Sequence, residues 1–207
     1  MKLRQLHALS AVVIMVYAAV HIANHLTALA GIQPHIAFMK TARAVYRVQV
    51  LELLLLACVA FQVLSGLVLV FRGWRQRRGL VPWLQAIAGA YLAFFLLVHV
   101  SAILFGRGVL HLDTNFYYAA AGFHVPPFQL FFAPYYFLAV VALFTHLACA
   151  IYWWRLAAGR QPTGLVIAVP ATLGVAISMF IVLSLSGVFY PVDIPAEYKA
   201  TYSAATS

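Results

Sequence analysis

Two histidines four residues apart, His21 and His25, lie inside an apolar run near the N-terminus, in the stretch VYAAVHIANHLT. A third, His99, lies in another apolar run, FFLLVHVSAIL. A neutral imidazole has one donor and one acceptor nitrogen, and burying it at the depth of a lipid bilayer costs free energy unless both find partners. The three residues are therefore candidates for metal ligands, proton carriers or hydrogen-bonding partners between helices.

The composition predicts the kind of protein that holds these histidines. The chain has 207 residues, of which 65% are hydrophobic and 8% charged, and its mean hydropathy is +0.96. A soluble domain carries about a quarter charged residues, so we expect an all-α integral membrane protein. Because no polar segment is long enough for a second domain, the prediction is one bundle over residues 1–207. Apolar runs of about 20 residues or more predict five transmembrane helices, at about 8–30, 49–71, 83–106, 128–154 and 164–190.

The distribution of positive charge predicts the topology. The net charge is +9, but the basic residues lie between the apolar runs rather than in one patch, so we expect no nucleic-acid partner. A cytoplasmic N-terminus would place eight basic residues on the inner side: Lys2, Arg4, Arg72, Arg75, Arg77, Arg78, Arg155 and Arg160. The outer side would hold five: Lys40, Arg43, Arg47, Arg107 and Lys199. This bias favours a cytoplasmic N-terminus.

The predicted spans give each intramembrane histidine a depth, at 1.5 Å of rise per residue. His21 is fourteen residues from His7, or about 21 Å from the inner edge, and His99 is sixteen residues from Trp83, or about 24 Å. Two neutral imidazoles at one level are what a six-coordinate haem b needs, so we expect His21 and His99 to be its axial iron ligands. A proton relay or a transition-metal transport site is the alternative, although transporters usually need more intramembrane carboxylates than Glu52 alone.

A second, incomplete pair lies in the inner half. His146 is eight residues from Trp154, or about 12 Å deep, and Gln62 on the second predicted helix is at about 14 Å. Glutamine is not a normal haem ligand. The site could hold a second, five-coordinate haem on His146, or it could be a former haem site in which Gln62 is bonded to His146. A plain hydrogen bond between helices would also explain His146.

Two further residues near the outer histidines could take part in quinone chemistry. Glu52, four residues into the second span, could transfer protons with a quinone, or it could pair with Arg43 or Arg47 at the interface. His25 lies one turn outward of His21 and could contact a haem propionate or a quinone carbonyl. The remaining histidines fall at predicted helix ends or in connectors and are expected to have no special role: His7, His35, His111 and His124.

These residues, in this order, resemble the cytochrome b membrane subunit of succinate:quinone oxidoreductases and quinol:fumarate reductases, in its five-helix, single-chain form. The resemblance covers most of the chain. Its segments are LHALSAVV in the first helix, HIAN at His21–Asn24, a Glu early in the second helix, QAIAG at Gln85–Gly89, VHV around His99, and HLACAIYWW at His146–Trp154.

The resemblance implies a fold, a cofactor set and partners. It implies two haems b, with the outer one on His21 and His99. The inner haem would take a histidine from the second helix and one from the fourth, which here map onto Gln62 and His146, so the chain departs from the pattern at Gln62.

The implied role is to anchor a flavoprotein and an iron–sulfur subunit on the cytoplasmic face of a bacterial inner membrane and to exchange electrons with quinone. The chain itself has no dinucleotide fold and no cysteine cluster, so we expect no succinate-oxidising site in it. A stand-alone cytochrome b with another redox partner is the alternative, and a non-haem transporter or structural bundle is a third.

Overall fold

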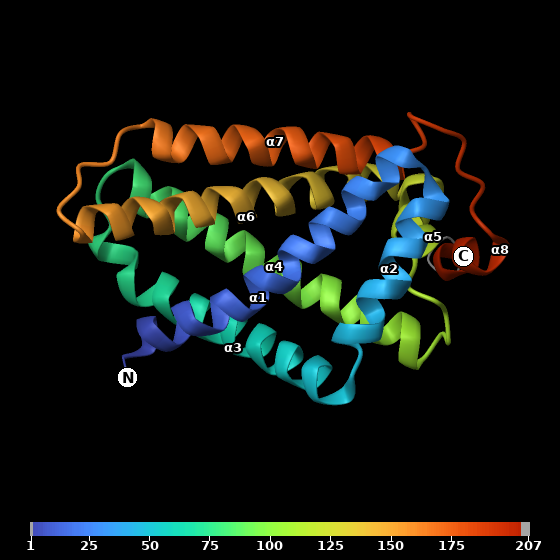
Figure 1. Ribbon diagram of the computed structural model, residues 1–207, viewed down its shortest axis with the longest axis horizontal. Helices are drawn as coiled ribbons and strands as arrows, with labels where there is room; N and C mark the ends of the chain where they lie inside the picture. The colour runs from blue at the N-terminus through green and yellow to red at the C-terminus, as the bar shows by residue number, and fades with distance from the viewer. Residues whose placement is uncertain (1, 204–207) are drawn as a thin grey trace.

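Five long helices form a bundle, and every regular element of the part of the chain described is helical. The computed structural model describes residues 2–203; Met1 and residues 204–207 of the predicted bundle lie outside them. The long helices run along the longest axis of the molecule (Figure 1) and are α1 (Leu3–Thr27), α3 (Gln49–Gly73), α4 (Leu80–Gly108), α6 (Gln129–Ala157) and α7 (Leu165–Leu185). Each is long and apolar enough to cross a membrane. The predicted all-α fold with five spans is therefore confirmed.

Several helix ends differ from the predicted ones. α1 begins at Leu3 rather than near residue 8, because the polar residues of its first turn contain no proline or glycine to stop it. α7 ends at Leu185 rather than 190, where Gly187 adopts a φ of +79° that reverses the chain. The basic segment after α3 continues as a short 3-10 turn, η2 (Trp74–Gln76).

One end of the bundle is covered by short elements that we call the cap. The cap consists of α2 (Ile32–Tyr46), α5 (Phe116–Ala120), η3 (Ala121–Phe123) and α8 (Ala196–Ser203), and the turn η1 (Ala28–Ala30) leads into it. Figure 1 shows these elements gathered at the end opposite the N-terminus. Fully buried side chains lie here, including Phe116 and Leu185. The cap therefore closes the bundle end toward which His21, His25 and His99 lie.

The long helices approach one another through small residues. Alanines of α4 and α6 are buried (Ala86, Ala88, Ala93, Ala139, Ala142 and Ala148). A Cβ atom at Gly174 of α7 would lie 2.7 Å from Cβ of Phe144 on α6, so only glycine permits this contact. Small interfacial residues are what helices use to associate in lipid, where the hydrophobic effect does not drive them together.

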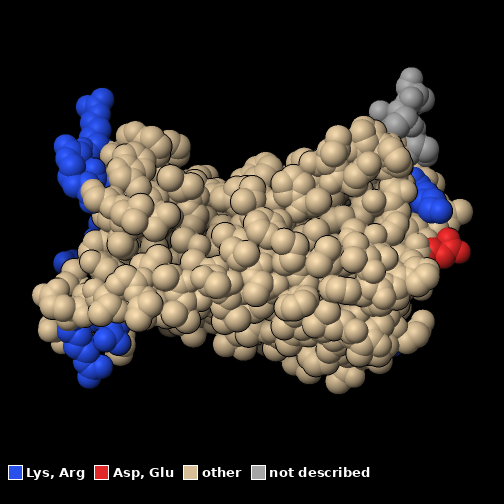
Figure 2. All heavy atoms as spheres, turned by 90° about the horizontal axis from the view of Figure 1, so that it is seen from above, with Lys and Arg blue, Asp and Glu red and all other residues tan. Residues whose placement is uncertain are grey.

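Charged residues gather at the two ends of the bundle. In Figure 2 the visible side between the ends shows no charged side chain, while blue clusters mark one end. We call this the basic end; it carries Lys2, Arg4, Arg72, Arg75, Arg78 and Arg160, all exposed. The apolar flank between two polar ends suits a chain surrounded by a lipid bilayer. That the basic end faces the cytoplasm stays a prediction.

Candidate functional site

His21 of α1 and His99 of α4 meet inside the bundle. Their ring centroids are 6.1 Å apart and the ring planes are inclined at 66°. From the observed helix starts, the two residues lie about 27 Å and about 28 Å from the basic end, at one level within a fraction of a turn. The depth match predicted from the sequence therefore corresponds to a direct approach of the two rings.

Aromatic side chains hold the planes of both imidazoles. Tyr17, one turn before His21 on α1, stacks on its ring at 5.7 Å with an interplanar angle of 14°. Phe95, one turn before His99 on α4, stacks at 4.9 Å and 15°. Tyr136 of α6 adds an edge contact to His99 at 6.3 Å. Each histidine is thus oriented by its own helix, through a neighbour four residues away.

The nitrogens of these rings have no hydrogen-bond partner. Within residues 2–203, no hydrogen bond involves a ring nitrogen of His21, His25 or His99, whereas four other histidines each make one (His7, His35, His124 and His146). A polar group left unpaired away from water costs free energy, more in lipid than at a protein surface. The ring nitrogens of His21 and His99 are therefore free to bind a ligand inside the bundle.

The spacing of the pair fits a metal ion between the rings. Imidazole nitrogens bind metal ions at about 2 Å and lie about 1 Å from their own ring centres, so two imidazoles on opposite sides of one ion have centres about 6 Å apart. The observed 6.1 Å agrees with this value. Among the residues described, no set of three or more His, Cys, Asp or Glu residues is arranged to hold a metal ion. A six-coordinate haem, which brings four nitrogens of its own, takes two further ligands from the protein, and two imidazoles could supply them.

A line of histidines continues from this pair into the cap. His25 lies 4.8 Å from His21 and 5.3 Å from His35 of α2, measured between ring centroids. Asn24 donates from Nδ2 to Nε2 of His35 at 3.2 Å, so His35 is neutral with its proton on Nδ1. Burial, together with the nearby His21 and Arg43, lowers the pKa of His35 to about 4. His35 was missed in the sequence; the signal was the helical spacing of Ile32, Ile36 and Met39 around it.

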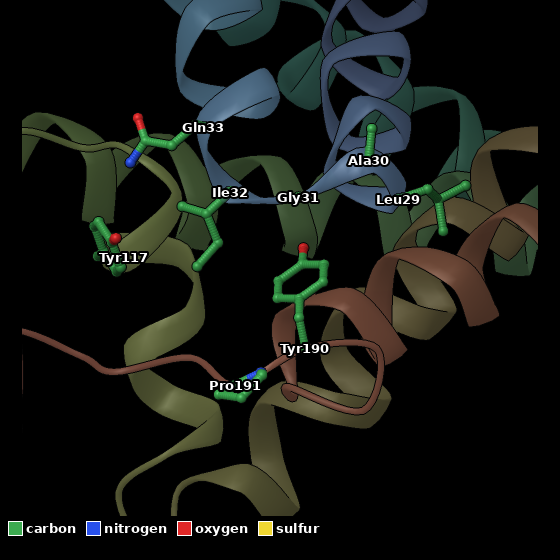
Figure 3. A pocket seen from close by; sticks show the side chains of 8 residues that line it. All are labelled: Leu29, Ala30, Gly31, Ile32, Gln33, Tyr117, Tyr190 and Pro191. Atoms are coloured by element: carbon green, nitrogen blue, oxygen red, sulfur yellow. The ribbon is translucent and has the colours of Figure 1, made fainter.

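A pocket opens beside this line of histidines. Figure 3 shows its wall, formed by the turn from Leu29 to Gln33 together with Tyr117, Tyr190 and Pro191, and its volume is about 470 Å³. The ring of Phe116 contacts Tyr117, Tyr190 and His35, at 6.0, 6.4 and 5.3 Å between centroids. One aromatic ring therefore separates the pocket wall from His35.

Glu52 has a different partner from those predicted. Its Oε1 accepts a hydrogen bond from Nη1 of Arg107 at the end of α4, in an ion pair. Arg43 instead forms an ion pair with Asp113, at 2.6 Å, and donates a hydrogen bond to the carbonyl oxygen of Thr114, at 2.8 Å. Arg47 donates to the hydroxyl oxygen of Thr114. The predicted pairing of Glu52 with Arg43 or Arg47 was wrong, because Arg43 on α2 and Arg47 just after it bind the loop that follows α4.

Gln62 lies in the inner half of the bundle, and its hydrogen bonds go to α1 rather than to His146. It donates from Nε2 to the backbone carbonyl of His7 and, at 2.8 Å, to the hydroxyl of Ser10, both on α1. His146 bonds through Nδ1 to the carbonyl oxygen of Gln85 on α4, at 3.1 Å. Within residues 2–203 no hydrogen bond joins Gln62 to His146, so the predicted bond between them is not formed. The reason is that Gln62 faces α1 while His146 faces α4.

The basic segment after α3 is partly engaged in its own fold. Arg77 donates to the carbonyls of Leu69 and Val70 at the end of α3, at 3.3 and 2.7 Å, and lies 5.8 Å from the ring centres of Trp74 and Trp83. Arg72, Arg75 and Arg78 remain exposed. Three of the four arginines of the segment are therefore available to another molecule or to lipid head groups.

Comparisons with known proteins add no identification: no family model, no curated protein and no solved structure was found that matches the chain.

Proposed function

We propose that the chain is the haem b-containing membrane anchor subunit of a succinate:quinone oxidoreductase or quinol:fumarate reductase of a bacterial inner membrane. The observation that carries the proposal is the His21–His99 pair, with centroids 6.1 Å apart and ring nitrogens that no residue of the described chain engages. The order of the histidines and their neighbouring motifs, which resembles that subunit, supports the identity of the partner complex.

In this proposal the chain's residues bind and orient the cofactor. Haem, when bound, supplies a one-electron carrier. His21 and His99 would hold it from two different helices, and the stacked rings of Tyr17 and Phe95 would keep the imidazoles in place. With two neutral histidines as ligands, both protein ligands would be uncharged, which suits a site inside the membrane.

Quinone would react at the cap. His25 and His35 extend from the haem ligands toward the pocket beside Tyr117 and Tyr190, and both can accept or release protons. Glu52 is held by Arg107 in its ion pair, so we place the first proton transfer on the histidines and leave Glu52 as the second candidate. With this assignment, protons would reach the quinone from the cap side of the membrane.

The iron–sulfur and flavoprotein partners would dock at the basic end. Arg72 in the last turn of α3 lies beside Lys2 and Arg4 of the N-terminus, in a groove that Leu69 and Gln76 also line. Clustered positive charge attracts an acidic protein surface or anionic lipid. A cytoplasmic basic end would therefore meet the partners on the side where succinate is handled.

A second candidate is a membrane cytochrome b that works alone or with another redox partner. The observation that favours it is Gln62, which stands where the family has a haem ligand and which instead clamps α1. A changed inner half would change the electron path between the outer haem and a docked iron–sulfur cluster.

Co-purification in mild detergent separates the two candidates. For the anchor we expect the tagged chain to bring down a flavoprotein and an iron–sulfur protein in equal amounts, detected by bound flavin and by the cluster signal. The double change Arg72→Glu and Arg75→Glu should reduce the recovered partners several-fold, because it reverses charge at the basic end. Lys40→Glu, an exposed charge reversal at the cap end, is the matched control and should leave recovery unchanged. Haem in the purified chain without either partner would favour the second candidate.

A further inference from the structure

A groove at the basic end lies between the start of α1 and the end of α3. Its volume is about 390 Å³, and its lining combines basic side chains with apolar ones, including Lys2, Arg4, Arg72, Leu3, Leu69 and Gln76. We propose that this groove, which we call the basic groove, binds the phosphate head group of one anionic phospholipid from the adjacent leaflet of the membrane. The inference goes beyond the proposed function and does not depend on haem.

The positive charge of the basic groove has no counter-ion within the chain. Among the hydrogen bonds and ion pairs of residues 2–203, none involves the guanidinium group of Arg4 or Arg72. Glu52, in the first turn of α3, precedes Arg72 by 20 residues, or about 30 Å along the helix. The other three acidic residues of the chain are also at the cap end: Asp113, Asp193 and Glu197. In Figure 2 the acidic side chain in view lies at the end opposite the blue clusters. An anion for the groove must therefore come from another molecule.

Phosphate is the anion that this set of side chains suits. The planar guanidinium group of arginine donates two parallel hydrogen bonds to phosphate oxygens, and the ammonium group of lysine adds a compact charge. Arg4 belongs to the first turn of α1 and Arg72 to the last turn of α3, so the two reach the groove from different helices. Basic pockets between transmembrane helices are known binding sites for anionic lipid head groups.

Tryptophans indicate that the groove lies at the level of the lipid head groups. The chain has four, and all of them lie at the ends of helices at the basic end: Trp74, Trp83, Trp153 and Trp154. The rings of Trp74 and Trp83 contact each other with centroids 5.1 Å apart, at the junction between α3 and α4. Tryptophan is enriched where a membrane meets water, because its ring is apolar and its N–H is polar. The helix ends that form the groove lie in the same interfacial layer.

Apolar side chains extend from the basic groove toward the middle of the bundle. On α1, Leu6 and Leu9 follow Lys2 at four and seven residues and therefore share its helix face, with 38% and 59% of their surface exposed. On α3, Val68 and Leu64 precede Arg72 at four and eight residues and are 38% and 66% exposed.

This pairing of charge with apolar surface favours a phospholipid over other anions. With the phosphate in the groove, the acyl chains of a lipid lie along these two apolar stripes. A free phosphate ion has no acyl chains, and an acidic protein surface that meets the end of the bundle would leave the stripes uncovered. A phospholipid is therefore the occupant that matches both parts of the surface.

The test measures lipid binding to the purified chain after its native lipids have been removed. Native mass spectrometry in detergent, with added phosphatidylglycerol, phosphatidylcholine or inorganic phosphate, should show one tightly bound phosphatidylglycerol and much weaker binding of the other two. Arg4→Gln and Arg72→Gln should each weaken the binding of phosphatidylglycerol about fivefold, the usual effect of one basic residue near an anionic membrane surface. Arg160→Gln is the matched control, because it makes the same charge change at an exposed position of the basic end outside the groove, and it should leave binding unchanged.

Three results would overturn this inference. Equal losses in Arg4→Gln, Arg72→Gln and Arg160→Gln would show that the lipid responds to total charge and not to the groove. Phosphatidylcholine or inorganic phosphate that binds as tightly as phosphatidylglycerol would contradict the predicted chemistry. Groove variants that keep the lipid but lose the flavoprotein and iron–sulfur partners would assign the groove to a protein surface. Haem content and helical circular dichroism are measured on the same samples, so a folded chain that binds the lipid but contains no haem would contradict the proposed function alone.

Discussion

Replacing His99 with alanine is expected to remove the outer haem from the protein. The substitution deletes one of the two proposed iron ligands, and the other, His21, lies on a different helix. Even the outer hydrogen-bonding partners of a metal ligand are worth about 10–100-fold in affinity, so we expect the haem affinity of the outer site to fall by at least that factor and its haem content to drop. The measurement is haem content of the purified variant together with its low-spin absorbance.

The control for this experiment is His111→Asn, an exposed histidine with a φ of 54°, a conformation that asparagine also tolerates. It should keep the full signal of the outer haem. Helical content and elution volume of the two variants should match, which separates loss of a ligand from loss of the fold. An outer haem signal that persists in His99→Ala would show that the ligand assignment is wrong.

The second large effect is on the pH dependence of stability, through His35. Its folded pKa of about 4 lies below its ordinary value of 6.5, because the ring is 2% exposed and surrounded by His21 and Arg43. The unfolded chain therefore takes up a proton between pH 6.5 and 4 that the folded chain refuses. The stability that His35 contributes is complete above pH 6.5 and is lost as the pH falls toward 4, by about 3 kcal/mol in total.

A neutral replacement isolates this contribution. We expect His35→Gln to lose less thermal stability than the wild type between pH 7.5 and 4.5, measured as the midpoint of the loss of helical circular dichroism in detergent. Glutamine keeps a hydrogen-bonding partner for Asn24 and cannot be protonated in this range. His111→Asn should follow the wild-type profile because that side chain is exposed. Equal acid sensitivity of His35→Gln and the wild type would contradict the role given to burial at this site.

Most of the bundle could be predicted from composition, because membrane spans are defined by length and hydropathy alone. The level of His21 and His99 also followed from counting residues, since an α-helix converts sequence separation into depth. The cap could not be predicted in this way. α2 is only half apolar and buries His35 and Met39 against elements that are distant in sequence, so its helical period was overlooked.

The side-chain partners of the inner half were beyond sequence reasoning for a different reason. Depth along a helix does not say which way a side chain faces. Gln62 and His146 lie at similar predicted depth, yet one contacts α1 and the other α4. His7 was assigned to a helix end, but α1 begins four residues earlier and carries His7 inward against Ser65 and Gly66. The partners of Gln62, His146 and His7 depend on how each helix is rotated about its own axis and on the residue at which α1 begins.

The central claim is that the chain binds haem b between His21 and His99, and the reduced-minus-oxidised absorption spectrum of the purified wild-type protein tests it most directly. We predict the sharp bands of a low-spin, six-coordinate b-type haem, with at least one haem per chain. A folded protein purified from cells with sufficient haem, but showing no b-type band on reduction, would contradict the claim.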